Sequence, residues 1–264
     1  MKIGFIGLGN MATAMMGGII ESKICEASNI IGSDLSEENR NKASKNLGIT
    51  LKDSNVLVAE ESDVLVLSVK PQVYPVVIEE IKNSVSDNQI IISIAPGKTL
   101  EYLSNSFGKE LKFVRCMPNT PALVKEGCTG VCKSAKVSDE EFGLVLNILN
   151  GFGKAIAVNE NQMDAVVAVS GSSPAYVFMF IEAMADQAVA EGLPRNAAYE
   201  FAAQAVLGSA KMVLETGKHP GELKDMVCSP AGTTIEAVRV LENKGFRSSV
   251  MEAMKVCADK SRSL

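Results

Sequence analysis

The sequence predicts an α/β fold: a doubly wound parallel sheet in the first part of the chain, followed by an all-helical domain. Short apolar runs without polar alternation, such as 3–6, 63–69 and 89–95, are typical of strands buried on both faces. Helical stretches separate these runs, which favours right-handed crossovers between parallel strands. After residue 158 such runs stop and alanine-rich helical periodicity begins, so we expect domains at 1–158 and 159–264.

The expected elements of the first domain alternate along the chain. Strands are expected at 3–6, 29–33, 63–69, 89–95 and 112–116, with weaker ones at 129–134 and 154–158. Helices are expected at 10–22, 36–47, 71–84, 99–107 and 138–150. Ligands of such sheets bind beyond the carboxyl ends of the strands. The site is therefore expected where these strands end.

A glycine turn follows the first strand. Gly7, Gly9 and Ala12 match a G-x-G-x-x-G/A fingerprint, in which free N–H groups at a helix N-terminus face a pyrophosphate. The alternative is a secretory signal that ends near Ala12-Thr13-Ala14. Glycines interrupt the apolar stretch of that signal, and it leaves Asp34 unexplained. We therefore interpret the first domain as a dinucleotide-binding domain of the Rossmann type.

Unusual residues stand at five expected strand ends. After the glycine turn these are Asp34, Lys70-Pro71, the segment 95–97 with Ala95, and the segment 117–121 with Asn119. Asp34 lies near the spacing of a carboxylate that accepts from the ribose 2′-OH, although it could instead cap the following helix. A carboxylate there repels a 2′-phosphate, which favours NADH. Arg40 and Lys42 are the residues that could favour NADPH.

Composition excludes several classes of function. The net charge is -5 and no basic tract stands out, which argues against nucleic-acid binding. We find no uninterrupted apolar run of roughly 18 residues, so no membrane span is expected. The six cysteines form no C-x-x-C pair, which indicates reduced thiols in a cytoplasmic protein. Cys128 and Cys132 with a single histidine do not predict a metal site.

The helical domain is apolar for its size. Val177, Phe180, Ile181, Met184 and Ala188 fall at helical spacing on one face, and a second long helix runs to about Glu215. So apolar a region is expected to be buried against a second copy of the chain. The alternative is a monomeric helical cap packed on the sheet.

The stretch 228–236 differs from the rest of this domain. Small residues and Pro230 precede an amphipathic helix, so Gly232, Thr233 and Thr234 are expected to present free backbone N–H groups. Such a helix start binds a small carboxylate. The alternative is an ordinary N-cap in which a threonine serves only its own helix.

Five motifs follow one another along the chain: Gly7-Leu8-Gly9-Asn10-Met11-Ala12, Ser68-Val69-Lys70-Pro71, Met117-Pro118-Asn119-Thr120-Pro121, Ser170-Gly171-Ser172-Ser173-Pro174-Ala175-Tyr176 and Ser229-Pro230-Ala231-Gly232-Thr233-Thr234. In these motifs the chain resembles the pyrroline-5-carboxylate reductase family. The resemblance implies reduction of 1-pyrroline-5-carboxylate to L-proline with NADH or NADPH, the last step of proline biosynthesis. It also implies a homodimer through interleaved helical domains, assembled in some members into a decamer.

The resemblance also implies roles for residues. Thr234 hydrogen-bonds the ring nitrogen of the substrate, and its carboxylate is held by the loop that contains Ser229, Gly232 and Thr233, while Glu160 contacts substrate. The cofactor residues implied by the resemblance and the strand ends are Ile6, Gly7, Leu8, Gly9, Asn10, Met11, Asp34, Asn55, Val69, Lys70, Pro71, Ala95 and Asn119. Ala231 and Ser173 depart from the family pattern, which has glycine at both positions.

The expected chemistry does not require an acid from the protein. A cyclic imine can enter already protonated, so hydride addition gives a neutral amine and catalysis is mostly positioning. His219, the only histidine, precedes Pro220 and is expected to start a helix rather than to catalyse. Two alternatives remain: another imine or hydroxyacid reductase of similar fold, and a nucleotide-binding regulatory protein without turnover. The hydroxyacid enzymes need a lysine on the first long helix of the second domain, and residues 172–192 contain none.

Overall fold

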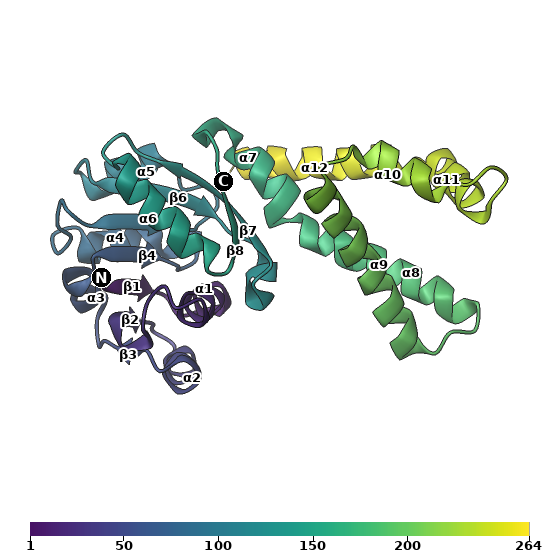
Figure 1. Cartoon of the computed structure of the whole chain (residues 1–264). Helices are drawn as coiled ribbons and strands as arrows, with labels where there is room; N and C mark the ends of the chain where they lie inside the picture. Colours follow the sequence, from purple (N-terminus) through teal and green to yellow (C-terminus); the bar gives the residue numbers. More distant parts are fainter. Residues whose placement is uncertain (264) are drawn as a thin grey trace. The chain divides into compact units, whose positions relative to one another are not determined.

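The computed structural model describes residues 1–263, which form two compact units (Figure 1). The first contains residues 1–172 and 257–263, and the second contains residues 173–256. This division differs from the boundary expected at residue 158, because the end of the chain packs with residues 159–172. Ser261 Oγ donates to Asp164 Oδ1 at 2.6 Å, and Cys257 Sγ donates to Ser172 Oγ at 3.1 Å.

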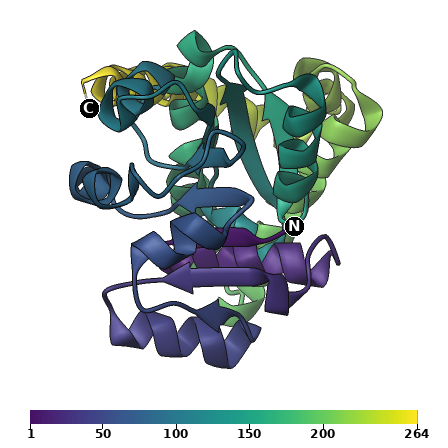
Figure 2. The ribbon, with the colours of Figure 1, turned by 90° about the vertical axis from the view of Figure 1, so that its left-hand side faces the viewer.

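The first unit is built on an eight-stranded sheet of order β3-β2-β1-β4-β5-β6-β7-β8 (Figures 1 and 2). Its strands are β1 Ile3–Ile6, β2 Ile30–Ser33, β3 Thr50–Leu51, β4 Val64–Leu67, β5 Ile90–Ser93, β6 Lys112–Met117, β7 Gly127–Lys133 and β8 Gly153–Ala157. The predicted doubly wound, mostly parallel sheet is confirmed, with the strand order reversing between β1 and β4. That reversal is where a dinucleotide binds in such folds.

One strand pair departs from the expected parallel arrangement. Strand β7 runs antiparallel to β6, whereas β8 is parallel to β7. The connection from β6 to β7 holds only the 3₁₀ helix η3 Thr120–Val124, which is too short for the crossover that a parallel pair needs. The two-residue strand β3 and the helix α3 Asn55–Glu61 were not expected either, since neither has a clear apolar period.

Helices cover both faces of the sheet. One face carries α1 Asn10–Glu21, α2 Glu37–Leu47 and α6 Asp139–Asn150, and the other carries α3, α4 Tyr74–Ile81 and α5 Leu100–Phe107. Strand β4 shows the consequence, because Val64 and Val66 lie in one core while Leu65 and Leu67 lie in the other. Every residue of β4 is buried, as an apolar run without alternation predicts.

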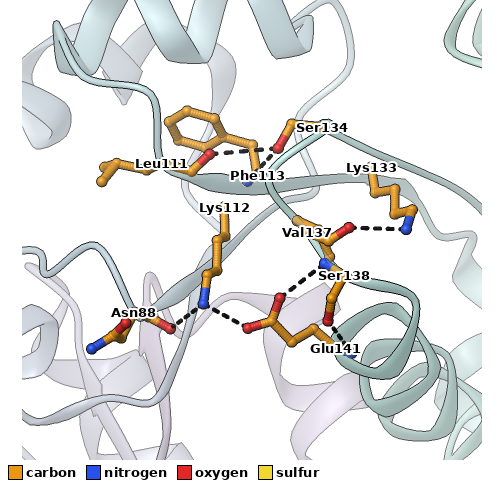
Figure 3. Close-up of polar contacts among 9 residues, drawn as sticks. All are labelled: Asn88, Leu111, Lys112, Phe113, Lys133, Ser134, Val137, Ser138 and Glu141. Atoms are coloured by element: carbon orange, nitrogen blue, oxygen red, sulfur yellow. Dashed lines mark hydrogen bonds and ion pairs between the residues drawn. The ribbon is translucent and has the colours of Figure 1, made fainter.

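Figure 3 shows the hydrogen bonds and the ion pair at the amino-terminal end of β6. Lys112 Nζ donates to Glu141 Oε1 at 2.6 Å, and the same carboxylate accepts from the backbone N–H of Ser138 at 2.9 Å. Ser138 Oγ in turn accepts from the N–H of Glu141, which completes a capping box at the start of α6. Ser134 Oγ accepts from the N–H of Phe113 at 3.1 Å and so bridges β6 and the segment after β7.

The last part of the first unit is an irregular helix. It comprises η4 Glu160–Gln162, α7 Met163–Val166 and the π-helical turn η5 Val167–Gly171. With the helix that follows, residues 160–190 are long and apolar enough to cross a membrane by length and composition alone, and 11% of the most apolar window is buried. A search for uninterrupted apolar runs misses this segment because serines, Gly171 and Pro174 divide it.

The second unit is helical throughout its regular structure. It contains α8 Ser173–Ala190, α9 Arg195–Thr216, α10 Pro220–Val227, α11 Thr233–Asn243 and most of α12 Phe246–Arg262. Helices α8 and α9 pack side by side. Large apolar side chains of this unit remain exposed, among them Phe178 at 60%, Met179 at 68% and Leu214 at 76%. His219 starts α10, as expected, with Nδ1 accepting from the N–H of Gly221 at 3.0 Å.

Candidate active site

The glycine turn joins β1 to α1. Gly7 has φ +95°, and a Cβ at this position would lie 2.9 Å from a methyl of Val69 and 3.0 Å from the backbone of Ser68. Beside Gly9 a Cβ would meet nothing within 4 Å, and Gly9 caps α1 without a side chain. The first N–H groups of α1 therefore have no capping side chain as acceptor, and the space beside Gly9 is open. This cradle fits a pyrophosphate group.

Asp34 ties the turn to the end of β2. Its Oδ2 accepts from the N–H of Leu8 at 2.6 Å and from Asn39 Nδ2 at 3.1 Å, and its Oδ1 accepts from the N–H of Ser36 at 2.8 Å. Ser36, rather than Asp34, is the N-cap of α2. The carboxylate thus stands fixed beside the phosphate cradle, which is where a ribose-binding carboxylate stands in this fold.

The surroundings of Asp34 carry both signs of charge. Ser33 Oγ donates to Asn55 Oδ1 at 2.7 Å, and Asn55 Nδ2 donates to Glu80 Oε2 at 2.7 Å, so the Asn55 amide is oriented. Arg40 Nη1 donates to the carbonyl oxygens of Asp34 at 2.6 Å and of Leu35 at 3.2 Å. A guanidinium therefore binds the backbone at Asp34 and Leu35.

The ends of β4 and β5 are held by hydroxyl groups. Ser68 Oγ donates to the carbonyl of Gly7 at 2.7 Å, which fixes the turn from its other side. Tyr74 is fully buried, and its hydroxyl donates to the carbonyl of Leu67 at 2.7 Å and lies 3.0 Å from Ser93 Oγ. Burial raises the pKa of Tyr74 well above its usual range, so this phenol stays neutral. Its hydrogen bonds connect the ends of β4 and β5.

A cleft of about 860 Å³ lies at the carboxyl ends of the strands. The structure brings twelve of the predicted cofactor residues into its lining: Ile6, Gly7, Gly9, Asn10, Met11, Asp34, Asn55, Val69, Lys70, Pro71, Ala95 and Asn119. The thirteenth, Leu8, is outside it. The Leu8 side chain is buried against Gly32, and the backbone N–H of Leu8 donates to the Asp34 carboxylate.

Glu160 is not part of the cleft lining. Its Oε1 accepts from Arg115 Nη1 at 3.0 Å and from the N–H of Leu100 at 2.8 Å. Arg115 is 6% exposed within β6, so this carboxylate neutralises a buried cation and caps the start of α5. A direct contact between Glu160 and substrate stays a prediction.

Sequence reasoning missed several lining residues, including Ser33, Leu35, Asn39 and Gly171, and it included Met117 only as part of the segment 117–121 at an expected strand end. Met117 and Gly171 lie within two of the motifs of the family resemblance, which was the available signal. The others have no motif, and the fold alone brings them to the cleft. No group of three or more histidine, cysteine, aspartate or glutamate residues able to hold a metal ion was found among residues 1–263.

The loop 229–234 belongs to the second unit. The N–H of Gly232 donates to the carbonyl of Ser229 at 3.0 Å, which closes a β-turn with Pro230 and Ala231 at its centre. Gly232 is the N-cap of α11 and offers no capping side chain, and Thr233 and Thr234 are the first residues of that helix. The start of α11 therefore presents N–H groups without a side-chain acceptor from its own cap.

The doubly wound sheet, the glycine cradle, the carboxylate at the end of β2 and the cleft between them define the class of protein. The chain is a Rossmann-fold protein of the dinucleotide-binding class, with a helical second domain.

The comparisons with known proteins narrow this class. Residues 160–264 match the family model described as pyrroline-5-carboxylate reductase dimerisation, and residues 2–97 match that of NADP oxidoreductase coenzyme F420-dependent. The pyrroline-5-carboxylate reductase of Escherichia coli is 52% identical over 263 residues, which are 100% of this chain and 98% of that protein. The chain belongs to the pyrroline-5-carboxylate reductase family.

Solved structures of relatives agree along the whole chain. A pyrroline-5-carboxylate reductase from Coxiella burnetii is 34% identical with a TM-score of 0.92, covering 99% of this chain and 97% of that one. A pyrroline carboxylate reductase from Plasmodium falciparum with NADP bound is 34% identical with a TM-score of 0.91 and the same coverage.

Proposed function

We propose that this chain reduces 1-pyrroline-5-carboxylate to L-proline with NADH or NADPH. The observation that carries the proposal is the uncapped start of α11, at Gly232, Thr233 and Thr234, in a chain whose first unit holds a dinucleotide cleft. A helix N-terminus with small residues suits a carboxylate substrate. Similarity to pyrroline-5-carboxylate reductases over the full chain supports the same reaction.

The residues of the chain supply binding and orientation. The bound nicotinamide supplies the hydride that adds to the imine carbon. Ser229 and the N–H group of Thr233 hold the substrate carboxylate, and the Thr234 hydroxyl hydrogen-bonds the ring nitrogen. The N–H of Gly232 was expected to be free, but it donates to the Ser229 carbonyl, so Gly232 contributes the shape of the turn. Because the imine enters as its protonated form, nitrogen keeps that proton and becomes the amine, so no side chain has to donate one. Most of the acceleration then comes from orientation.

We infer a preference for NADH. The Asp34 carboxylate stands beside the phosphate cradle with three hydrogen bonds that hold it in place, and it repels a 2′-phosphate. Arg40 is the residue that would oppose this preference, but its Nη1 is engaged with two backbone carbonyls. Measuring kcat/KM with each nucleotide tests the inference, and a preference for NADPH would overturn it.

We infer that the second unit forms a homodimer. Its exposed apolar side chains would be buried in an interface between two copies, and the matching family model is described as a dimerisation domain. Assembly of such dimers into a decamer is a further proposal. Sedimentation velocity distinguishes these states, and a monomer at micromolar concentration would overturn the inference. We also infer that the enzyme works in the cytoplasm in proline biosynthesis, which suits its six free cysteines.

A hydroxyacid dehydrogenase is the second candidate enzyme. A 3-hydroxyisobutyrate dehydrogenase of Mycobacterium tuberculosis shares the fold at 16% identity and a TM-score of 0.51. An alkoxide product needs an acid, and helix α8 contains no lysine to provide it. This favours the imine as substrate.

One assay separates these readings. Purified protein is given pyrroline-5-carboxylate with NADH or NADPH, and oxidation of the nucleotide is followed, with pyrroline-2-carboxylate tested in parallel. 3-Hydroxyisobutyrate is tested with NAD+ or NADP+, and reduction of the nucleotide is followed. We expect turnover with pyrroline-5-carboxylate far above the other two. Nucleotide binding without turnover of any of the three would instead favour a regulatory protein.

A further inference from the structure

Asn119 lines the cleft, yet its side chain is used within the protein. The residue is 8% exposed and follows the end of β6. Its Nδ2 donates to the carbonyl of Ser170 at 3.1 Å and to Ser170 Oγ at 3.2 Å, and its Oδ1 accepts from the N–H of Cys128 at 2.8 Å. A side chain engaged on both sides is placed to hold other groups rather than to bind a ligand itself.

Ser170 completes the arrangement. Its Oγ donates to the carbonyl of Cys128 at 3.0 Å, so Asn119 and Ser170 together pair both backbone polar groups of Cys128. The sheet explains why these groups need partners. Strand β6 ends at Met117, opposite Gly130, so Cys128 lies beyond the last residue of β6 that pairs with β7. The two side chains replace a strand neighbour at this point.

Ser170 sits in the π-helical turn η5. The N–H of Ser172 donates to the carbonyl of Val167 at 2.9 Å, five residues back, and this widened turn brings Gly171 to the cleft. A Cβ on Gly171 would lie 2.8 Å from Met117 Cε. The backbone of Gly171 and the side chain of Met117 therefore form one wall of the cleft. Single π turns of this kind are found at functional sites.

This wall lies at the carboxyl end of β6, whereas Asp34 lies at the end of β2. In the sheet order, β2 and β6 stand on opposite sides of the pair β1 and β4. A dinucleotide bound over the glycine turn, with its adenosine ribose at Asp34, extends its nicotinamide toward β5 and β6. The wall of Met117 and Gly171 is therefore at the reactive end of the cleft.

We propose that Asn119 and Ser170 are positioning residues that clamp the π turn to β7, and so set the wall of Met117 and Gly171 against which the nicotinamide is oriented. The proposal rests on the proposed function, because it assigns one end of the cleft to the nicotinamide. The proposal also changes the predicted role of Asn119. Its side chain holds Ser170 and Cys128 in place instead of binding the cofactor, although the residue lines the cleft.

The test uses Ser170→Ala, with Ser170→Thr as the variant that keeps the hydroxyl. Ser134→Ala is the matched control, since Ser134 Oγ also bridges two backbone groups, Phe113 N–H and Leu111 carbonyl, at the other end of β6 (Figure 3). Binding of NADH and of ADP-ribose, which lacks the nicotinamide, is measured by titration for each variant. If the wild type binds NADPH more tightly than NADH, NADPH and 2′-phospho-ADP-ribose are used in place of NADH and ADP-ribose.

We expect Ser170→Ala to weaken NADH binding about fivefold and to leave ADP-ribose binding within about twofold of the wild type. Its kcat should fall about tenfold. Ser170→Thr should restore both, and Ser134→Ala should lower the melting temperature without changing the ratio of the two affinities. In the protein without nucleotide, hydrogen exchange at residues 168–172 should become faster in Ser170→Ala alone.

Two results would overturn the proposal. One is that Ser170→Ala weakens the binding of NADH and of ADP-ribose equally, or changes neither affinity. The other is that Ser134→Ala changes the ratio of the two affinities as much as Ser170→Ala does. The titrations contain no imine substrate, so their outcome does not depend on whether the wild type reduces pyrroline-5-carboxylate.

Discussion

The carboxylate of Asp34 accepts a 2.6 Å hydrogen bond from the backbone N–H of Leu8. The end of β2 thus holds the glycine turn directly, 26 residues away in the chain. One side chain fixes the shape of the phosphate cradle and also places a negative charge beside it. The proposed preference for NADH rests on this placement of the charge.

Asp34→Asn is predicted to shift cofactor preference toward NADPH. The amide keeps an oxygen to accept from Leu8 but removes the charge that repels a 2′-phosphate. We expect the ratio of kcat/KM for NADPH to that for NADH to rise about tenfold. Asp53→Asn removes a neighbouring exposed charge and should change the ratio less than threefold or so. An unchanged ratio in Asp34→Asn would leave Asp34 with only its role in holding the turn.

Much of this site was predictable from the sequence. Gly7, Gly9 and Asp34 follow short apolar runs, so their place at the strand ends depends only on local pattern. Asn119 was predicted to border the cleft, but its bonds to Ser170 and Cys128 join distant parts of the chain and no local pattern encodes them. The antiparallel β7 was missed for a similar reason, because strand direction depends on a connection whose path is tertiary. Glu160 faces Arg115, a buried partner that the sequence does not reveal.

Thr234→Ala is predicted to lose turnover while cofactor binding is retained. The hydroxyl at the start of α11 is proposed to hold the ring nitrogen, so its loss should lower kcat/KM for pyrroline-5-carboxylate about 100-fold. The Kd for nucleotide should stay within about twofold. Thr234→Ser keeps the hydroxyl and should recover most of the activity. Near-normal kcat/KM in Thr234→Ala would remove this residue from the mechanism.

Ala231→Gly is predicted to stabilise the protein. Ala231 has φ +54° at the centre of the 229–232 turn, a left-handed conformation that costs a residue with a Cβ roughly 1 kcal/mol. Glycine removes this cost but gains freedom when unfolded, so the net stabilisation is about 0.5 kcal/mol, or about 1–2 °C in Tm. Ala237→Gly, inside helix α11, should destabilise by about 1 kcal/mol. Equal losses in the two variants would contradict the turn geometry.

Glu141→Gln is predicted to make the free energy of unfolding depend less on pH in the acid range. Hydrogen bonds from Lys112 and from the N–H of Ser138 hold the pKa of Glu141 below its usual range (Figure 3). A carboxylate with a lowered folded-state pKa stabilises the fold above its unfolded pKa of about 4.3, and this contribution is lost as pH falls through the folded-state value. The difference in unfolding free energy between wild type and Glu141→Gln should therefore be present at pH 7 and shrink toward pH 3. Glu140→Gln is the control for removing a charge from the same helical turn, and a difference that is constant with pH would refute the assignment.

The most direct measurement of the central claim follows the hydride itself. Pyrroline-5-carboxylate is incubated with the enzyme and with nucleotide deuterated at C4 of its reduced nicotinamide, the two C4 epimers being used separately, and the product is examined by NMR. We predict L-proline with a single deuterium at C5, the former imine carbon, from one epimer and unlabelled L-proline from the other. Absence of L-proline from both reactions, with the nucleotide unconsumed, would contradict the claim that this chain is a pyrroline-5-carboxylate reductase.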